Sequence, residues 1–247
     1  LAIAYSDNGD NTSARQHLEQ VCDICQTIGD RRVEGYGWVF LGLVLEEMGE
    51  LEDARDAYLQ GLELRREVGL HAMANDPLAG LARVATLEGN HSEAVEYAQR
   101  VLGWIDENGY EGIGDPLLAY VGVYRALLEA GQSEKGCATL EVAYARLMEF
   151  ADSISDPEQR RAYLHDIDPG RSIWNDYQNY IVGETTLREK VCLARADAPL
   201  GRALQDSECI EICWTIKEPR DAEIEGKADC RQHRLLRLID EAQLQGG

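Results

Sequence analysis

Apolar side chains recur at intervals of three and four residues through the first 150 positions of the chain, separated by polar residues. In residues 38–48, and again in residues 51–62, this spacing places the apolar side chains on one side of an α-helix. Gly49 separates the two runs, and glycine most readily adopts the left-handed conformation that ends a helix. The pattern therefore predicts a hairpin of two amphipathic helices, which needs neighbours to bury its apolar faces.

This hairpin recurs along the chain with a period of 40 residues. The glycine between the helices and an alanine five positions later return together, as Gly9, Ala14, Gly49, Ala54, Gly89 and Ala94. A fourth copy has its glycine at Gly131, and we place the longer connection before it in residues 104–116, with a helix starting near Leu117. Residues 1–150 thus predict an all-α, right-handed superhelical solenoid of about four hairpins, the first of them truncated.

The second hairpin carries a recognisable order of bulky, Leu-Gly, alanine, aromatic and small residues. They are Trp38, Leu41, Gly42, Leu45, Gly49, Ala54, Tyr58 and Gly61. In this order they resemble the tetratricopeptide repeat (TPR), although the period of 40 exceeds the usual 34 of that family. Arrays of such longer repeats resemble the sensor regions of large bacterial transcription regulators and signal-transduction ATPases. The resemblance implies a non-catalytic, protein- or ligand-binding module of a transcription or signalling regulator.

The resemblance also implies where a partner binds. In TPR solenoids the first helix of each hairpin lines a concave groove that accepts a protein or peptide. Counting along the repeats places nine residues in that groove: Tyr36, Val39, Leu43, Glu46, Arg83, Thr86, Val121, Arg125 and Leu128. Because two of these are arginines in an acidic chain, we expect an acidic or carboxylate-bearing peptide as the ligand.

Residues 151–184 predict helices that cap the open end of the solenoid. Ser155 precedes an Asp-Pro pair, and Glu158 follows three residues after Ser155, a spacing that resembles a capping box. In residues 185–219 apolar side chains alternate with other residues, as at Ile210 and Ile212, which predicts a small β-hairpin or linker.

The last segment, residues 220–247, predicts a final helix with a cluster of basic residues. This helix resembles the first helix of a winged-helix or helix-turn-helix domain, in which a later helix reads DNA. We therefore expect contact with DNA only through a domain beyond Gly247. The chain also opens on Leu1 inside an apolar pattern, which we interpret as the start of a fragment.

Composition narrows the class of protein. The formal net charge of -21 argues against a general surface for nucleic acids or anionic membranes. No run of about 18 apolar residues and no basic-then-apolar leader occurs in the sequence, so we expect a cytoplasmic protein with no membrane partner. Seven cysteines, an odd number in a long acidic chain, favour reduced thiols over a disulfide framework.

Motifs for chemistry are sparse. No phosphate-binding loop, nucleophile elbow or histidine pair with metal-binding spacing occurs, so we predict no catalytic residue, no metal and no cofactor. The pairs Cys22/Cys25 and Cys209/Cys213 allow a four-thiolate zinc site, which we disfavour because such cysteines also fill small buried positions. The alternative function is a TPR scaffold of a signalling enzyme of the cyclase or kinase type, with its catalytic domain outside residues 1–247.

Overall fold

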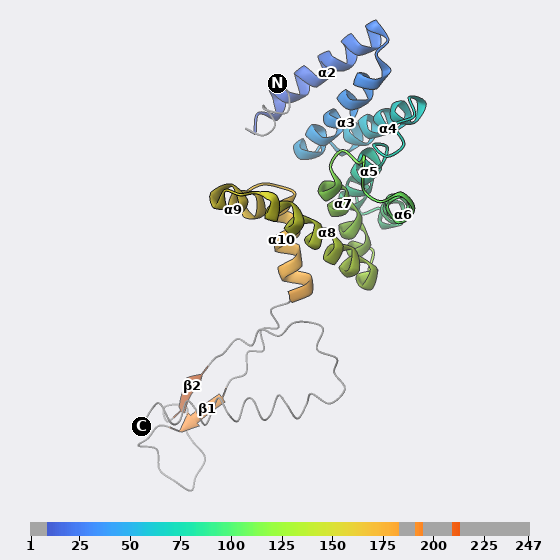
Figure 1. Cartoon of the computed structure of the whole chain (residues 1–247). Coiled ribbons are helices and arrows are strands. Elements are labelled where there is room, and N and C mark those ends of the chain that lie inside the picture. The colour runs from blue at the N-terminus through green and yellow to red at the C-terminus, as the bar shows by residue number, and fades with distance from the viewer. Residues whose placement is uncertain (1–8, 183–190, 195–208, 213–247) are drawn as a thin grey trace. The chain divides into compact units, whose positions relative to one another are not determined.

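The computed structural model describes residues 9–182, 191–194 and 209–212. Two compact units divide the chain, Leu1–Tyr177 and Gln178–Gly247. The helices of the first unit (Figure 1) are α2 (Asn11–Ile28), α3 (Arg31–Met48), α4 (Leu51–Glu67), α5 (Asn75–Leu87), α6 (His91–Asn108), α7 (Pro116–Glu129), α8 (Ser133–Ser153), α9 (Pro157–His165) and α10 (Gly170–Tyr177).

Consecutive helices pair as hairpins, α3 with α4, α5 with α6 and α7 with α8. The first helices of these hairpins also contact one another, α3 with α5 and α5 with α7, while α2 packs on α3 as the second helix of a truncated hairpin. The recurring alanines Ala14, Ala54 and Ala94 are fully buried in the core. The predicted all-α solenoid of helical hairpins is therefore confirmed.

Glycines with positive φ stand at the turns of the solenoid. Gly49 has φ of 77°, its N–H donates to the carbonyl of Glu46, and the N–H of Glu50 donates back to the carbonyl of Leu45 at 2.9 Å. These bonds close the end of α3 and turn the chain into α4. A positive φ also occurs at Gly9, Gly29, Gly69, Gly89, Gly109, Gly112 and Gly131.

Two helix boundaries differ from the prediction. The loop before α7 is shorter than predicted, because residues 104–108 continue α6 as far as Asn108. At the start of α9 the capping side chain is Asp156 and not Ser155, since its carboxylate accepts the N–H groups of Glu158 and Gln159 at 2.8 and 3.1 Å. A carboxylate at this position satisfies two N–H groups that have no partner within the helix.

Helices α9 and α10 follow the last hairpin. Helix α10 contacts α7, α8 and α9, and the ring of Tyr177 stacks on Tyr144 of α8 with their centroids 3.8 Å apart. Trp174 lies against the same Tyr144 ring, at 5.7 Å. Aromatic contacts thus attach α10 to the end of the helical array.

In the second unit the structure describes three short elements. A π-helical turn covers Gln178–Val182, and strands β1 (Val191–Ala194) and β2 (Cys209–Ile212) pair antiparallel, with Val191 opposite Ile212. Both strands lie within the segment 185–219. The predicted basic helix of residues 220–247 lies outside the described residues.

Candidate functional site

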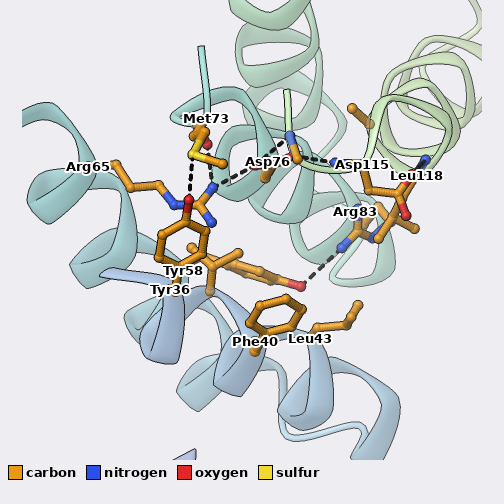
Figure 2. A pocket seen from close by; sticks show the side chains of 13 residues that line it. Tyr36, Phe40, Leu43, Tyr58, Arg65, Met73, Asp76, Arg83, Asp115 and Leu118 are labelled. Atoms are coloured by element: carbon orange, nitrogen blue, oxygen red, sulfur yellow. Dashed lines mark hydrogen bonds and ion pairs between the residues drawn. The ribbon is translucent and has the colours of Figure 1, made fainter. Parts of the chain in front are cut away.

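A cavity of about 390 Å³ opens on the face formed by α3, α5 and α7, which we name the first-helix face. Its wall is mainly apolar with a few polar groups, the make-up typical of ligand sites. We name it the central cavity (Figure 2); it is lined by Tyr36, Val39, Phe40, Leu43, Tyr58, Arg65, Met73, Asp76, Arg83, Gly114, Asp115, Leu118 and Ala119.

Tyr58 reaches the cavity from α4 by passing between two first helices. Its ring is buried and lies over Gly42 of α3 and Gly80 of α5. A Cβ atom at Gly42 would lie 2.7 Å from the Tyr58 ring, and one at Gly80 would lie 2.5 Å from it. Both distances are shorter than van der Waals contact, so the two glycines create the slot through which the phenol passes.

The hydroxyl of Tyr58 ends beside a nearly buried ion pair. Arg83 donates to both carboxylate oxygens of Glu46, with Nε–Oε1 at 2.7 Å and Nη2–Oε2 at 2.9 Å. The Tyr58 hydroxyl accepts from Arg83 at 3.0 Å and donates to Glu46 at 2.7 Å. Burial acts to lower the pKa of Arg83, but the Glu46 carboxylate outweighs it and the pKa is raised. The guanidinium therefore stays charged and oriented.

A second arginine, Arg65, pairs with Asp76 on the opposite side of the cavity (Figure 2). Its Nη1 lies 2.7 Å from Asp76 Oδ2, and its Cζ lies 5.2 Å from the centre of the Tyr36 ring. Asp76 also accepts the N–H groups of Gly114 and Asp115, at 3.2 and 3.1 Å. One carboxylate thus fixes both Arg65 and the loop that leads into α7.

Asp115 stands at the cavity as the N-cap residue of α7. Its Oδ1 accepts the N–H of Leu118 at 2.9 Å. Burial raises the pKa of Asp115, and the neighbouring Asp76 carboxylate raises it further. Among the residues described by the structure, no cation lies within ion-pair distance of Asp115, in contrast to Asp76.

Arg125 of α7 has partners of the same kind, away from the central cavity. Its Nε and Nη2 lie 2.9 and 2.8 Å from Oδ2 of Asp176 on α10, and the Tyr124 hydroxyl donates to the same oxygen at 2.7 Å. Arg83 and Arg125 therefore both receive a carboxylate from the chain itself. This pairing removes the basis of the expected acidic ligand, which assumed that the two guanidinium groups were free.

The structure gathers about half of the predicted groove residues at one place. Tyr36, Val39, Leu43 and Arg83 line the central cavity, and Glu46 adjoins it through its bonds to Arg83. These five positions remain our proposed contacts for a partner.

The other four predicted residues are not part of the cavity lining. The Thr86 hydroxyl donates to the carbonyl of Ala82 in its own helix at 2.7 Å, and Val121 is only 3% exposed. Arg125 is paired with Asp176, and Leu128 packs over the position of Gly136. Val121 in particular is buried within the protein, so a partner cannot contact it.

Several cavity residues were missed by counting along the repeats. Phe40 was detectable, because Tyr36, Phe40 and Leu43 follow the spacing of four and three that marks one helical face. Leu118 was also detectable, since it is the residue of the fourth repeat that corresponds to Tyr36. Arg65, which comes from a second helix, reaches the cavity only through packing that no repeat position predicts.

The Cys22/Cys25 pair of the sequence lies on α2 of the first unit. Cys22 and Cys25 are buried on α2, and burial raises the pKa of Cys22 to about 12. Cys22 therefore stays a neutral thiol at physiological pH. Within residues 9–182, 191–194 and 209–212, no group of three or more potential metal ligands comes together.

Comparison with known proteins agrees with the repeat geometry. Residues 34–103 match a family model described as tetratricopeptide repeat, and residues 1–28 match a second model with the same description. Residues 1–28 and 34–103 are thus similar in sequence to tetratricopeptide repeats. No curated protein matches the chain.

Solved structures with similarity to this chain include a Podosopora anserina putative kinesin light chain with nearly identical TPR-like repeats. It is 21% identical, with a TM-score of 0.48, over 72% of this chain and 86% of that one. A single-residue variant of the same protein is 20% identical, with a TM-score of 0.49, over 72% and 85%. Separately, none of the helices in the described part of this chain is long and apolar enough to cross a bilayer.

Proposed function

We propose that this chain is a non-catalytic protein-interaction module that binds an extended peptide segment of a partner protein on its first-helix face. The observation that carries the proposal is the central cavity, because three successive hairpins build it together. Helix α3 supplies Tyr36, Phe40 and Leu43, α5 supplies Arg83, and α7 supplies Leu118. A peptide running across these helices would insert a side chain between repeats, as extended segments do on solenoid surfaces.

We further propose that the module is the sensor part of a bacterial transcription or signalling regulator that acts in the cytoplasm. The 40-residue repeats that resemble such sensor arrays support this context, and the acidic composition fits a part that does not itself touch DNA. The whole reading frame tests it. A helix-turn-helix pattern after Gly247 supports the regulator, whereas a nucleotide-binding catalytic domain before Leu1 without that pattern supports the signalling-enzyme alternative.

Peptide selection with a cavity-filling variant tests the binding function. Random dodecapeptides displayed on phage are selected on the immobilised full chain and on Leu118→Trp, in which a larger side chain fills the central cavity. Leu59→Trp is the matched control, since Leu59 is 41% exposed on α4 and is not part of the cavity lining. We expect peptides that bind the wild type and Leu59→Trp but not Leu118→Trp. Failure to select any peptide, or equal binding to all three proteins, contradicts the function.

A further inference from the structure

Among the residues that the structure describes, one acidic group at the central cavity has no ion-pair partner. Arg83 is held by both oxygens of Glu46, and Arg65 is held by Asp76. A carboxylate ligand would have to displace one of these internal carboxylates from a nearly buried site. Asp115, by contrast, has no cation at ion-pair distance among the described residues, and Arg83, which is paired with Glu46, lowers the pKa of Asp115 only from farther away. A positively charged ligand group would therefore complement the charges of the cavity better than a negatively charged one.

The apolar wall of the cavity complements this acidic group. Tyr36 and Tyr58 each have a guanidinium near one ring face, Arg65 at 5.2 Å and Arg83 at 6.0 Å. Within residues 9–182, 191–194 and 209–212, no arginine occupies the ring of Phe40 in this way. An aromatic face without a cation attracts one, and it also packs well against the methylene stem of a long basic side chain.

We propose that the central cavity binds an arginine or lysine side chain of a partner peptide, with its stem against Phe40 and Leu118 and its charge at the Asp115 carboxylate. This inference rests on the proposed peptide-binding function and names the chemistry of its ligand. The net charge of -21 on the chain favours approach of a basic segment from a distance. The cavity volume of about 390 Å³ lies within the range of sites that enclose a ligand group.

The role of the Asp115 charge can be tested with a variant that preserves the N-cap of α7. Asparagine caps helices as well as aspartate does, so Asp115→Asn removes the negative charge while preserving the bond to the Leu118 N–H. Asp30→Asn is the matched control, because Asp30 is the N-cap residue of α3, bonds to the Val33 N–H at 3.1 Å, and is not part of the cavity lining.

The probe is the strongest dodecapeptide from the selection on the wild-type chain, labelled with fluorescein and titrated by fluorescence anisotropy. We expect a basic residue that recurs at one position of the selected peptides. Its replacement by methionine should weaken binding by about tenfold, and its replacement by glutamate by more. Asp115→Asn should weaken the basic peptide about tenfold and leave the methionine peptide unchanged, whereas Asp30→Asn should change neither.

The outcomes separate this inference from the function on which it rests. Peptides that Leu118→Trp rejects, but whose common residue is acidic or uncharged, would overturn the basic-ligand inference and leave the binding function intact. Unchanged binding of the basic peptide to Asp115→Asn would overturn it as well. Peptides that bind Leu118→Trp as tightly as the wild type would overturn both the binding function and the basic-ligand inference.

Discussion

Arg83 and Arg125 occupy the same position in consecutive repeats, yet they receive their carboxylates from different parts of the chain. Arg83 pairs with Glu46 on the preceding first helix. The residue that corresponds to Glu46 in the next repeat is Thr86, and Arg125 pairs with Asp176 of α10. The Arg83 side chain is 11% exposed and that of Arg125 is 43% exposed. An interior arginine is thus neutralised by its neighbouring repeat, and a terminal one by an added helix.

The largest expected effect comes from breaking the interior pair. Glu46→Gln leaves the Arg83 guanidinium nearly buried without a counter-charge and should lower the free energy of unfolding by about 3 kcal/mol. The shift of the urea midpoint at an unchanged m-value measures it. Glu63→Gln, at an exposed position of α4, is the control and should change stability by less than about 0.5 kcal/mol. Equal effects would show that Arg83 does not depend on Glu46.

The slot for Tyr58 gives the next largest effect. In Gly80→Ala the new methyl group meets the Tyr58 ring, which lies between backbones that cannot easily move apart, and we expect a loss of about 2 kcal/mol. Gly103→Ala on α6 is the control, for which we expect a change in stability of the opposite sign. No atom lies within 4 Å of a Cβ there, so alanine should stabilise the helix by about 0.5 to 1 kcal/mol. Thermal unfolding of both variants distinguishes crowding from a general effect of alanine.

Breaking the Arg125–Asp176 pair should lower the free energy of unfolding by a smaller amount. Asp176→Asn removes the carboxylate from a half-exposed Arg125, which water can solvate, so we expect a loss of less than about 1 kcal/mol in urea unfolding. A loss as large as that of Glu46→Gln would abolish the distinction between interior and terminal arginines.

The smallest expected effect appears only at alkaline pH. Burial raises the pKa of both Tyr58 and Tyr124 above their ordinary value of 10, so the folded protein keeps these protons to higher pH than the unfolded chain does. Their stabilising contribution is therefore complete below pH 10 and falls as pH rises above it. Tyr58→Phe and Tyr124→Phe should each make this fall shallower by a similar amount, because both phenols stay protonated in the folded protein across this pH range. Urea midpoints from neutral pH to about pH 11 measure both slopes.

The fold could be predicted because the same local sequence signals occur in each repeat. Gly49 and Ala54 mark a turn and a close crossing, and their return at a fixed period predicts stacked hairpins. Local signals were less reliable at helix ends: Ser155 and Asp156 both can cap a helix, and the choice depends on which side chain faces the free N–H groups.

The site was only partly predictable, because pairing between repeats is not a local property. Helical spacing identifies Tyr36 and Leu43 as members of one face. It does not reveal that Arg83 would be neutralised by Glu46, which lies 37 residues away in the sequence, or that Arg65 would enter the cavity from a second helix. The proposed sign of the ligand charge therefore rests on the arrangement in space and not on the sequence.

The passage of Tyr58 between Gly42 and Gly80 also bears on cooperativity. One side chain joins α4 to both α3 and α5, so the second hairpin cannot open without uncovering part of the third. In a linear array of repeats, stability is a sum of terms for each repeat and for each interface between repeats. The Tyr58 contacts strengthen the interface between the second and third hairpins more than alanine contacts alone would. Hydrogen exchange should therefore show α3, α4 and α5 losing protection together as a single unfolding unit.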